Sequence, residues 1–135
     1  MAGVEGRVAL ITGGSRGIGR ATADLLASRG ARVMCVARSE QELADAGFEY
    51  AVADLGNPEG CAQAVKETEQ RLGPVEILVC NHGIGSAHEK VLWEQKSEDW
   101  SETIRINLDG PFHLSRLVMK GMVERKFGRI VFTSS

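Results

Sequence analysis

Hydrophobic residues along the chain fall into short runs, which are separated by longer segments where they recur every three or four positions. Five runs have the length and nearly continuous apolar character of buried strands, at residues 8–11, 33–37, 48–53, 75–80 and 130–133. The segments between them have the period of amphipathic helices. Because strands that alternate with helices form βαβ units, the pattern predicts a doubly wound α/β fold with a parallel sheet and helices on both faces.

Helix-capping residues stand at the ends of several of these segments. Residues 57–60 read Asn-Pro-Glu-Gly, in which an N-cap Asn precedes a Pro at the first helical position. Ser39 and Glu42 have the spacing of a capping box, and Gly30 stands where a left-handed residue ends a helix. We therefore expect helices to begin near residues 40 and 58 and the first helix to end near Gly30.

Composition narrows the function classes. The chain has 135 residues, of which 43% are hydrophobic and 25% charged, as in an ordinary globular protein of one domain. The net charge of −2 lacks the basic excess of a nucleic-acid binder, so we expect no nucleic-acid partner. No apolar run approaches membrane-spanning length and no targeting segment is visible, so we expect a cytoplasmic protein without membrane contact. The three cysteines have no metal or disulfide spacing and are expected in the core.

A glycine-rich loop directly follows the first predicted strand. Residues 12–21 read TGGSRGIGRA and run straight into the first predicted helix. Gly13 allows the tight turn off the strand, Gly17 lets the backbone approach a ligand, and Gly19 lets the helix pack close to the sheet. The start of such a helix binds a pyrophosphate through its free N–H groups and its dipole. A P-loop would need Gly-Lys-Ser/Thr here, so the loop predicts dinucleotide binding instead.

Further motifs follow in the order of one known family. The segments TGGSRGIG, ADL with Asp54, NHGIG at residues 81–85, RINLDGPF with Asn107 and GRIVFTSS ending in Ser135 resemble those of the short-chain dehydrogenase/reductase family. The resemblance implies a Rossmann-type sheet of about five strands in the order 3-2-1-4-5. It also implies that residues 1–135 are the amino-terminal part of a single NAD(P)-binding domain, so the sheet is expected to be incomplete.

The family match also assigns roles to residues. Asn107 and Ser135 correspond to catalytic positions. The residues implied to bind the cofactor are Gly13, Ser15, Arg16, Gly17, Ile18, Gly19, Arg38, Asp54, Leu55, Asn81 and Gly83. His82 replaces the Ala of the family motif and is given no catalytic role. We expect no metal site, because neither His88 nor His113 belongs to a metal-like cluster.

The end of the second predicted strand favours NADP over NAD. Ala37 stands where an NAD-specific member would place an acid that accepts from the ribose 2′-hydroxyl. Arg38 and Arg16 are expected to converge near the ribose, where guanidinium groups pair with a 2′-phosphate. The alternative is that both arginines are solvated surface residues.

The chemistry of the family needs a Tyr-x-x-x-Lys motif that the 135 residues do not contain. The single tyrosine is Tyr50, and Asp54 stands four residues later. One interpretation is that the chain is the amino-terminal part of an NADP-dependent oxidoreductase that interconverts a ketone and an alcohol. The other is that it is a dinucleotide-binding module without chemistry.

A polypeptide that ended at Ser135 is expected to be poorly soluble and inactive. A complete protein is expected to form homo-oligomers. The segments SEDW and GRIV weakly resemble 3-oxoacyl-acyl-carrier-protein reductases.

A proline four residues after Asn107 affects the helix expected there. Pro111 has no N–H to donate to the Asn107 carbonyl, so a kink and a carbonyl that is free to bind water are expected. In the family, such a water connects to the catalytic Lys. The alternative is that Gly110 and Pro111 end one helix and start another.

Overall fold

Five parallel strands form one sheet in the order β3-β2-β1-β4-β5. The structure is a computed structural model and describes residues 3–85 and 90–134. The strands are β1 (Val8–Thr12), β2 (Arg32–Ala37), β3 (Glu49–Val52), β4 (Ile77–Cys80) and β5 (Arg129–Phe132). This order and the parallel pairing confirm the predicted Rossmann-type sheet. The third and fourth strands are shorter than the apolar runs that predicted them, because each run extends into the connecting loops.

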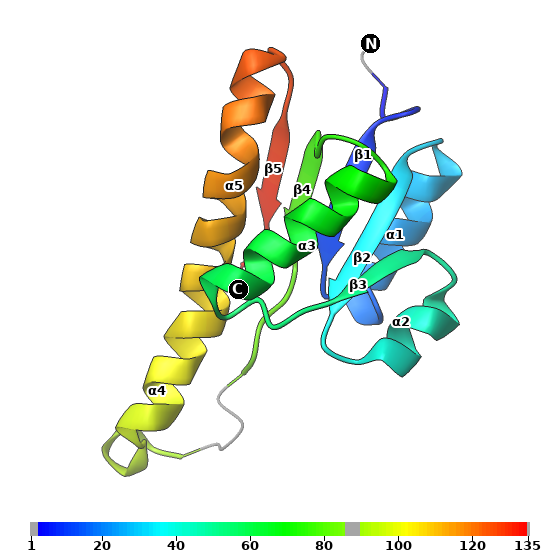
Figure 1. The fold of residues 1–135 in the computed structure, drawn as a ribbon. Helices are drawn as coiled ribbons and strands as arrows, with labels where there is room; N and C mark the ends of the chain where they lie inside the picture. The colour runs from blue at the N-terminus through cyan, green and yellow to red at the C-terminus, as the bar shows by residue number, and fades with distance from the viewer. Residues whose placement is uncertain (1–2, 86–89, 135) are drawn as a thin grey trace.

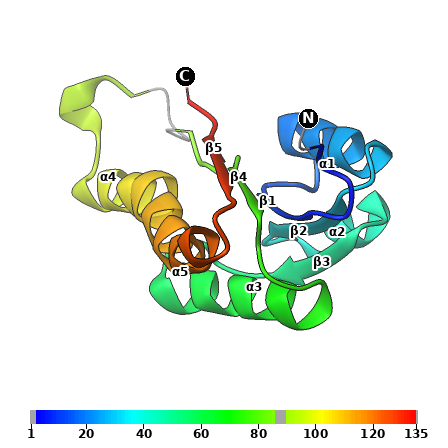
Figure 2. The same cartoon turned by 90° about the horizontal axis from the view of Figure 1, so that it is seen from above.

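Helices cover both faces of the sheet (Figures 1 and 2). On one face lie α1 (Gly17–Ser28) and α2 (Glu40–Ala46), and on the other α3 (Pro58–Arg71) and α5 (Gly110–Glu124). The short 3₁₀ helix η1 (Leu92–Glu94) and helix α4 (Ser97–Ile104) follow β4. Within the described residues, no helix is both long and apolar enough to cross a lipid bilayer.

The core has two layers because successive side chains of a strand point to opposite faces. Leu10 of β1 packs in the layer beneath α3 and α5, whereas Ile11 packs in the layer beneath α1 and α2. The three cysteines are free and buried, as predicted. Burial raises the pKa of Cys35 and Cys80 to about 12, so both remain protonated core side chains.

The predicted capping residues act at helix ends. Asn57 is the N-cap of α3 and accepts a hydrogen bond of 2.6 Å from the Gly60 N–H. Ser39 is the N-cap of α2 and accepts from the Glu42 N–H at 3.5 Å. Gly30 follows α1 with a φ of 86°, the left-handed conformation expected there.

A π-helical turn precedes Gly110 and Pro111, where the sequence predicted a kink or a boundary between two helices. Residues Arg105–Asp109 form a π-helical turn, η2, which joins α4 to α5 without a break. The Gly110 N–H donates to the Arg105 carbonyl, five residues back, and Pro111 then lies in the first turn of α5. The chain therefore stays helical through Gly110 and Pro111, and the N–H that Pro111 lacks leaves the Ile106 carbonyl without a donor from the next residue of the turn.

Candidate functional site

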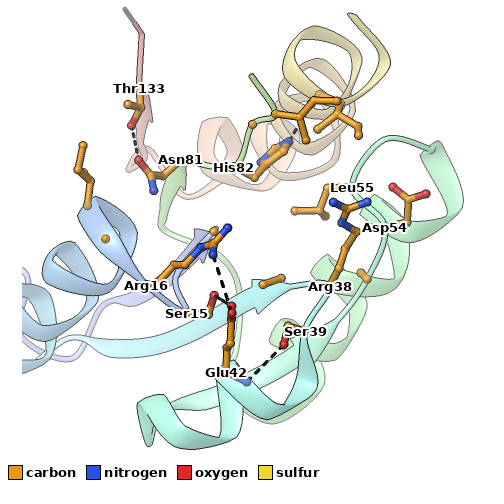
Figure 3. Close-up of a pocket in the computed structure, with 18 residues that line it drawn as sticks. Ser15, Arg16, Arg38, Ser39, Glu42, Asp54, Leu55, Asn81, His82 and Thr133 are labelled. Carbon is orange, nitrogen blue, oxygen red and sulfur yellow. Dashed lines mark hydrogen bonds and ion pairs between the residues drawn. The ribbon is translucent and has the colours of Figure 1, made fainter. Parts of the chain in front are cut away.

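A cleft of about 570 Å³ lies at the carboxyl ends of the strands, where ligands bind in open α/β sheets (Figure 3). The strands are in register there, with Thr12 of β1 beside Val36 of β2 and Cys80 of β4. The residues that line the cleft are Gly13, Ser15, Arg16, Gly17, Ile18, Ala37, Arg38, Ser39, Glu42, Ala53, Asp54, Leu55, Asn81, His82, Gly83, Ile84, Ile106 and Thr133. They include all the predicted cofactor residues except Gly19.

The glycine loop forms one wall of the cleft. Gly13 and Gly17 have φ values of 64° and 58°, which favour glycine. A Cβ on Gly17 would meet nothing within 4 Å, so backbone there is open to a ligand. A Cβ on Gly19 would lie 2.1 Å from the Gly13 carbonyl oxygen, so Gly19 serves the close packing of helix and loop. This open cradle at the start of α1 fits a phosphate group.

Arg16, Arg38 and Glu42 line the part of the cleft next to the glycine loop (Figure 3). Arg38 follows Ala37 directly, and no acid stands at the end of this strand. Glu42 of α2 lies 3.9 Å from the Arg16 guanidinium and accepts a hydrogen bond of 3.2 Å from the Ser15 hydroxyl. In the sequence, Glu42 stands out only as a capping-box residue, and nothing in its spacing indicates that its carboxylate reaches the glycine loop.

Asp54 connects the cleft to the π-turn. Its carboxylate accepts from the Gly56 N–H at 2.9 Å, from Asn57 Nδ2 at 3.3 Å and from the Arg105 guanidinium at 3.2 Å. The Gly56 hydrogen bond is the main cause that lowers the pKa of Asp54, and Arg105 lowers it further. An ionised Asp54 therefore borders the cleft, and Leu55 beside it is buried.

Thr12 and His82 form a partly buried polar network behind the glycine loop. The Thr12 hydroxyl oxygen accepts from the Asn81 N–H at 3.0 Å and from the His82 N–H at 3.2 Å. It lies 2.6 Å from His82 Nδ1, while His82 Nε2 lies 3.0 Å from the Ile106 carbonyl oxygen. Burial lowers the pKa of His82, so the neutral ring is favoured. The sequence showed His82 as a departure from the family motif, but it did not indicate Thr12 and Ile106 as the partners of the ring.

Of the two predicted catalytic residues, Asn107 and Ser135, the structure describes Asn107. The Asn107 side chain pairs with the backbone of Ile84, accepting from its N–H and donating to its carbonyl, both at 2.8 Å. Ser135 and His88 lie outside the described residues. Thr133, two residues before Ser135, donates to Asn81 Oδ1 at 2.9 Å and so brings the end of β5 to the cleft. In the described ranges, no three side chains that could ligate a metal come together.

Comparison with known proteins agrees with this geometry. A family model described as short chain dehydrogenase matches residues 7–135. The chain belongs to the short-chain dehydrogenase family. The resemblance stated from the motifs is thus confirmed.

Several curated relatives within this family are named 3-oxoacyl-[acyl-carrier-protein] reductase FabG. The chain is 41% identical to the one from Vibrio cholerae over 139 residues, which cover 98% of this chain and 56% of that protein. It is 38% identical to the one from Escherichia coli strain K12, with 97% and 55% covered, and 34% identical to the one from Haemophilus influenzae, with 95% and 54% covered. The chain thus spans about half the length of these relatives.

Proposed function

We propose that the protein is an NADP-dependent oxidoreductase that transfers hydride between the nicotinamide and a ketone or alcohol. The 135 residues would supply the cofactor cleft and two residues of the reaction site, Asn107 and Ser135. The proposal covers the whole protein, whose Tyr-x-x-x-Lys motif would have to lie outside these residues.

The observation that supports the cofactor best is the open glycine cradle beside two arginines. Gly17 offers free space for a pyrophosphate at the start of α1. Arg16 and Arg38 line the same cleft, and the neutral Ala37 ends β2. Guanidinium groups bind a 2′-phosphate by charge-assisted hydrogen bonds, whereas NAD-binding sites use an acid at this strand end. This combination favours NADP.

The roles of the residues follow from the chemistry. The bound cofactor would supply or accept the hydride. The glycine loop would hold its pyrophosphate, Asp54 and Leu55 would border the adenine, and Asn81 and Gly83 would border the nicotinamide side of the cleft. Reduction of a carbonyl places charge on its oxygen, so a hydroxyl donor at the end of β5 would stabilise that charge. Ser135 is proposed as this donor.

The relatives suggest a substrate class. The three named above are 3-oxoacyl-[acyl-carrier-protein] reductases, so a 3-oxoacyl thioester is the first substrate to try. The full-length polypeptide should oxidise NADPH when such a thioester is added. Ser135→Ala should lower kcat by about a hundredfold or more, the usual loss for one such donor.

A second interpretation is a dinucleotide-binding module without chemistry. It would be favoured over the enzyme if the full-length polypeptide bound NADPH but oxidised none in the presence of 3-oxoacyl thioesters and simple ketones. Loss of binding itself would contradict both interpretations.

We also propose that the protein forms homo-oligomers. Four exposed apolar side chains follow one face of η2 and α5, at spacings of four, seven and four residues: Leu108, Phe112, Met119 and Val123. Between 49% and 70% of each residue is exposed. An apolar stripe of this length on a helix indicates an interface with another helix.

A further inference from the structure

The π-turn leaves the Ile106 carbonyl available. In an α-helix its donor would be the Gly110 N–H, but that group donates to the Arg105 carbonyl. The next residue, Pro111, has no N–H to donate. A buried carbonyl needs a donor from elsewhere. His82 Nε2, at 3.0 Å, is that donor.

The contact between His82 and the π-turn is close-fitting. A Cβ on Gly110 would lie 2.7 Å from His82 Nε2 and 2.4 Å from the Leu55 carbonyl oxygen. A residue with any side chain at Gly110 would therefore push the turn away from the ring. Glycine at this position lets the imidazole approach the helix backbone.

The opposite edge of the ring is fixed by Thr12. Because Nε2 donates to the Ile106 carbonyl, Nδ1 of the neutral ring is an acceptor, and the Thr12 hydroxyl donates to it at 2.6 Å. The same hydroxyl oxygen accepts two backbone N–H groups, from Asn81 and from His82 itself. The ring thus bridges the end of β1 and the π-turn.

The same loop and turn are joined a second time at Asn107. This residue follows Ile106 directly, and its side-chain amide forms two hydrogen bonds of 2.8 Å to the backbone of Ile84, two residues after His82. A Cβ on Gly83 would lie 3.2 Å from Asn107 Oδ1, so the amide is packed closely against the loop. The two contacts lie side by side and hold the same pair of segments.

We propose that His82 is a positioning residue that holds the π-turn against the loop after β4 and thereby fixes the Asn107 side chain on Ile84, which lines the cleft. The value of this position for the reaction rests on the proposed function, but the positioning itself does not. Alanine, which the family motif has here, lacks the donor that the Ile106 carbonyl needs.

The test measures hydrogen exchange of the Ile84 amide in the full-length polypeptide without cofactor, since that N–H donates to Asn107. His82→Ala should speed this exchange about tenfold, the factor for one net hydrogen bond of ordinary strength. His82→Gln, whose side-chain N–H₂ can replace Nε2 as a donor, should restore exchange to within about threefold of the parent. His113→Ala, which removes the imidazole on α5, is the matched control and should leave exchange unchanged.

Nitrogen NMR of the parent gives a second readout that does not depend on whether the variants fold. It should show His82 as the neutral tautomer with its proton on Nε2. A proton on Nδ1, or equal Ile84 exchange in the parent and His82→Ala, would overturn the proposal. Because neither readout involves NADPH, loss of the proposed cofactor binding would leave this result standing.

Discussion

Thr12 is the residue on which the polar network behind the cleft depends. Thr12→Val keeps the shape of the side chain but leaves two partly buried backbone N–H groups and His82 Nδ1 without their partner. We expect a loss of about 2–3 kcal/mol in the free energy of unfolding. Thr68→Val is the control, because Thr68 is equally buried but donates only to the Ala64 carbonyl within its own helix. Denaturant unfolding that gave equal losses for the two variants would contradict this role.

His82 should make the stability of the fold depend on pH. Burial lowers its pKa below the ordinary value of 6.5. The ring is hydrogen-bonded to Thr12 and the Ile106 carbonyl, and not to the charged side chains that line the cleft, which are Arg16, Arg38, Glu42 and Asp54. The unfolded chain then binds the proton more readily than the folded one. The stability that the neutral His82 ring contributes is therefore fully present above pH 6.5, and it is lost as the pH falls through the lowered pKa.

Denaturant unfolding between pH 5 and pH 7.5 measures this dependence. The parent should lose stability over the acidic part of the range more steeply than His82→Gln, which has no group that titrates there. Parallel curves for the two proteins would show that His82 is not the titrating group.

At the scale of elements, the strands and the glycine loop were predictable and the π-turn was not. Continuous apolar runs and the position of Gly13, Gly17 and Gly19 predict strands, loop and first helix from local spacing alone. The π-turn depends on a distant contact, because the His82 ring supplies the donor that the turn omits. Glu42 was missed for a similar reason: its contacts with Ser15 and Arg16 join segments that local spacing does not relate.

The seating of the π-turn can be tested at Gly110. Gly110→Ala would place a Cβ 2.4 Å from the Leu55 carbonyl oxygen, which is backbone and cannot move alone. We expect a loss of about 1–3 kcal/mol from this overpacking. Gly121→Ala in the same helix meets only the end of the Arg125 side chain, which can shift although it donates to the Val75 carbonyl, and should cost less than Gly110→Ala. Thermal unfolding in which Gly110→Ala matched Gly121→Ala would contradict the close fit.

At the scale of the whole molecule, the apolar stripe of Leu108, Phe112, Met119 and Val123 predicts self-association. The full-length protein should sediment as a dimer or larger species at micromolar concentration. Phe112→Lys should weaken association at least tenfold, because it places a charge in the middle of an apolar interface. Leu92→Lys, at an exposed position on η1 outside the stripe, is the control. A monomeric parent protein would refute this prediction.

Fluorescence titration of the full-length protein with NADPH and NADH tests whether the cleft binds a dinucleotide with a 2′-phosphate. NADPH should bind at least tenfold more tightly, a difference of about 1.4 kcal/mol or more. Arg38→Ala should remove most of that difference, whereas Arg116→Ala, on α5 outside the cleft, should leave it unchanged. Equal affinities for the two cofactors, or an Arg38→Ala protein that binds NADPH as the parent does, would show that Arg38 and the cleft do not recognise a 2′-phosphate.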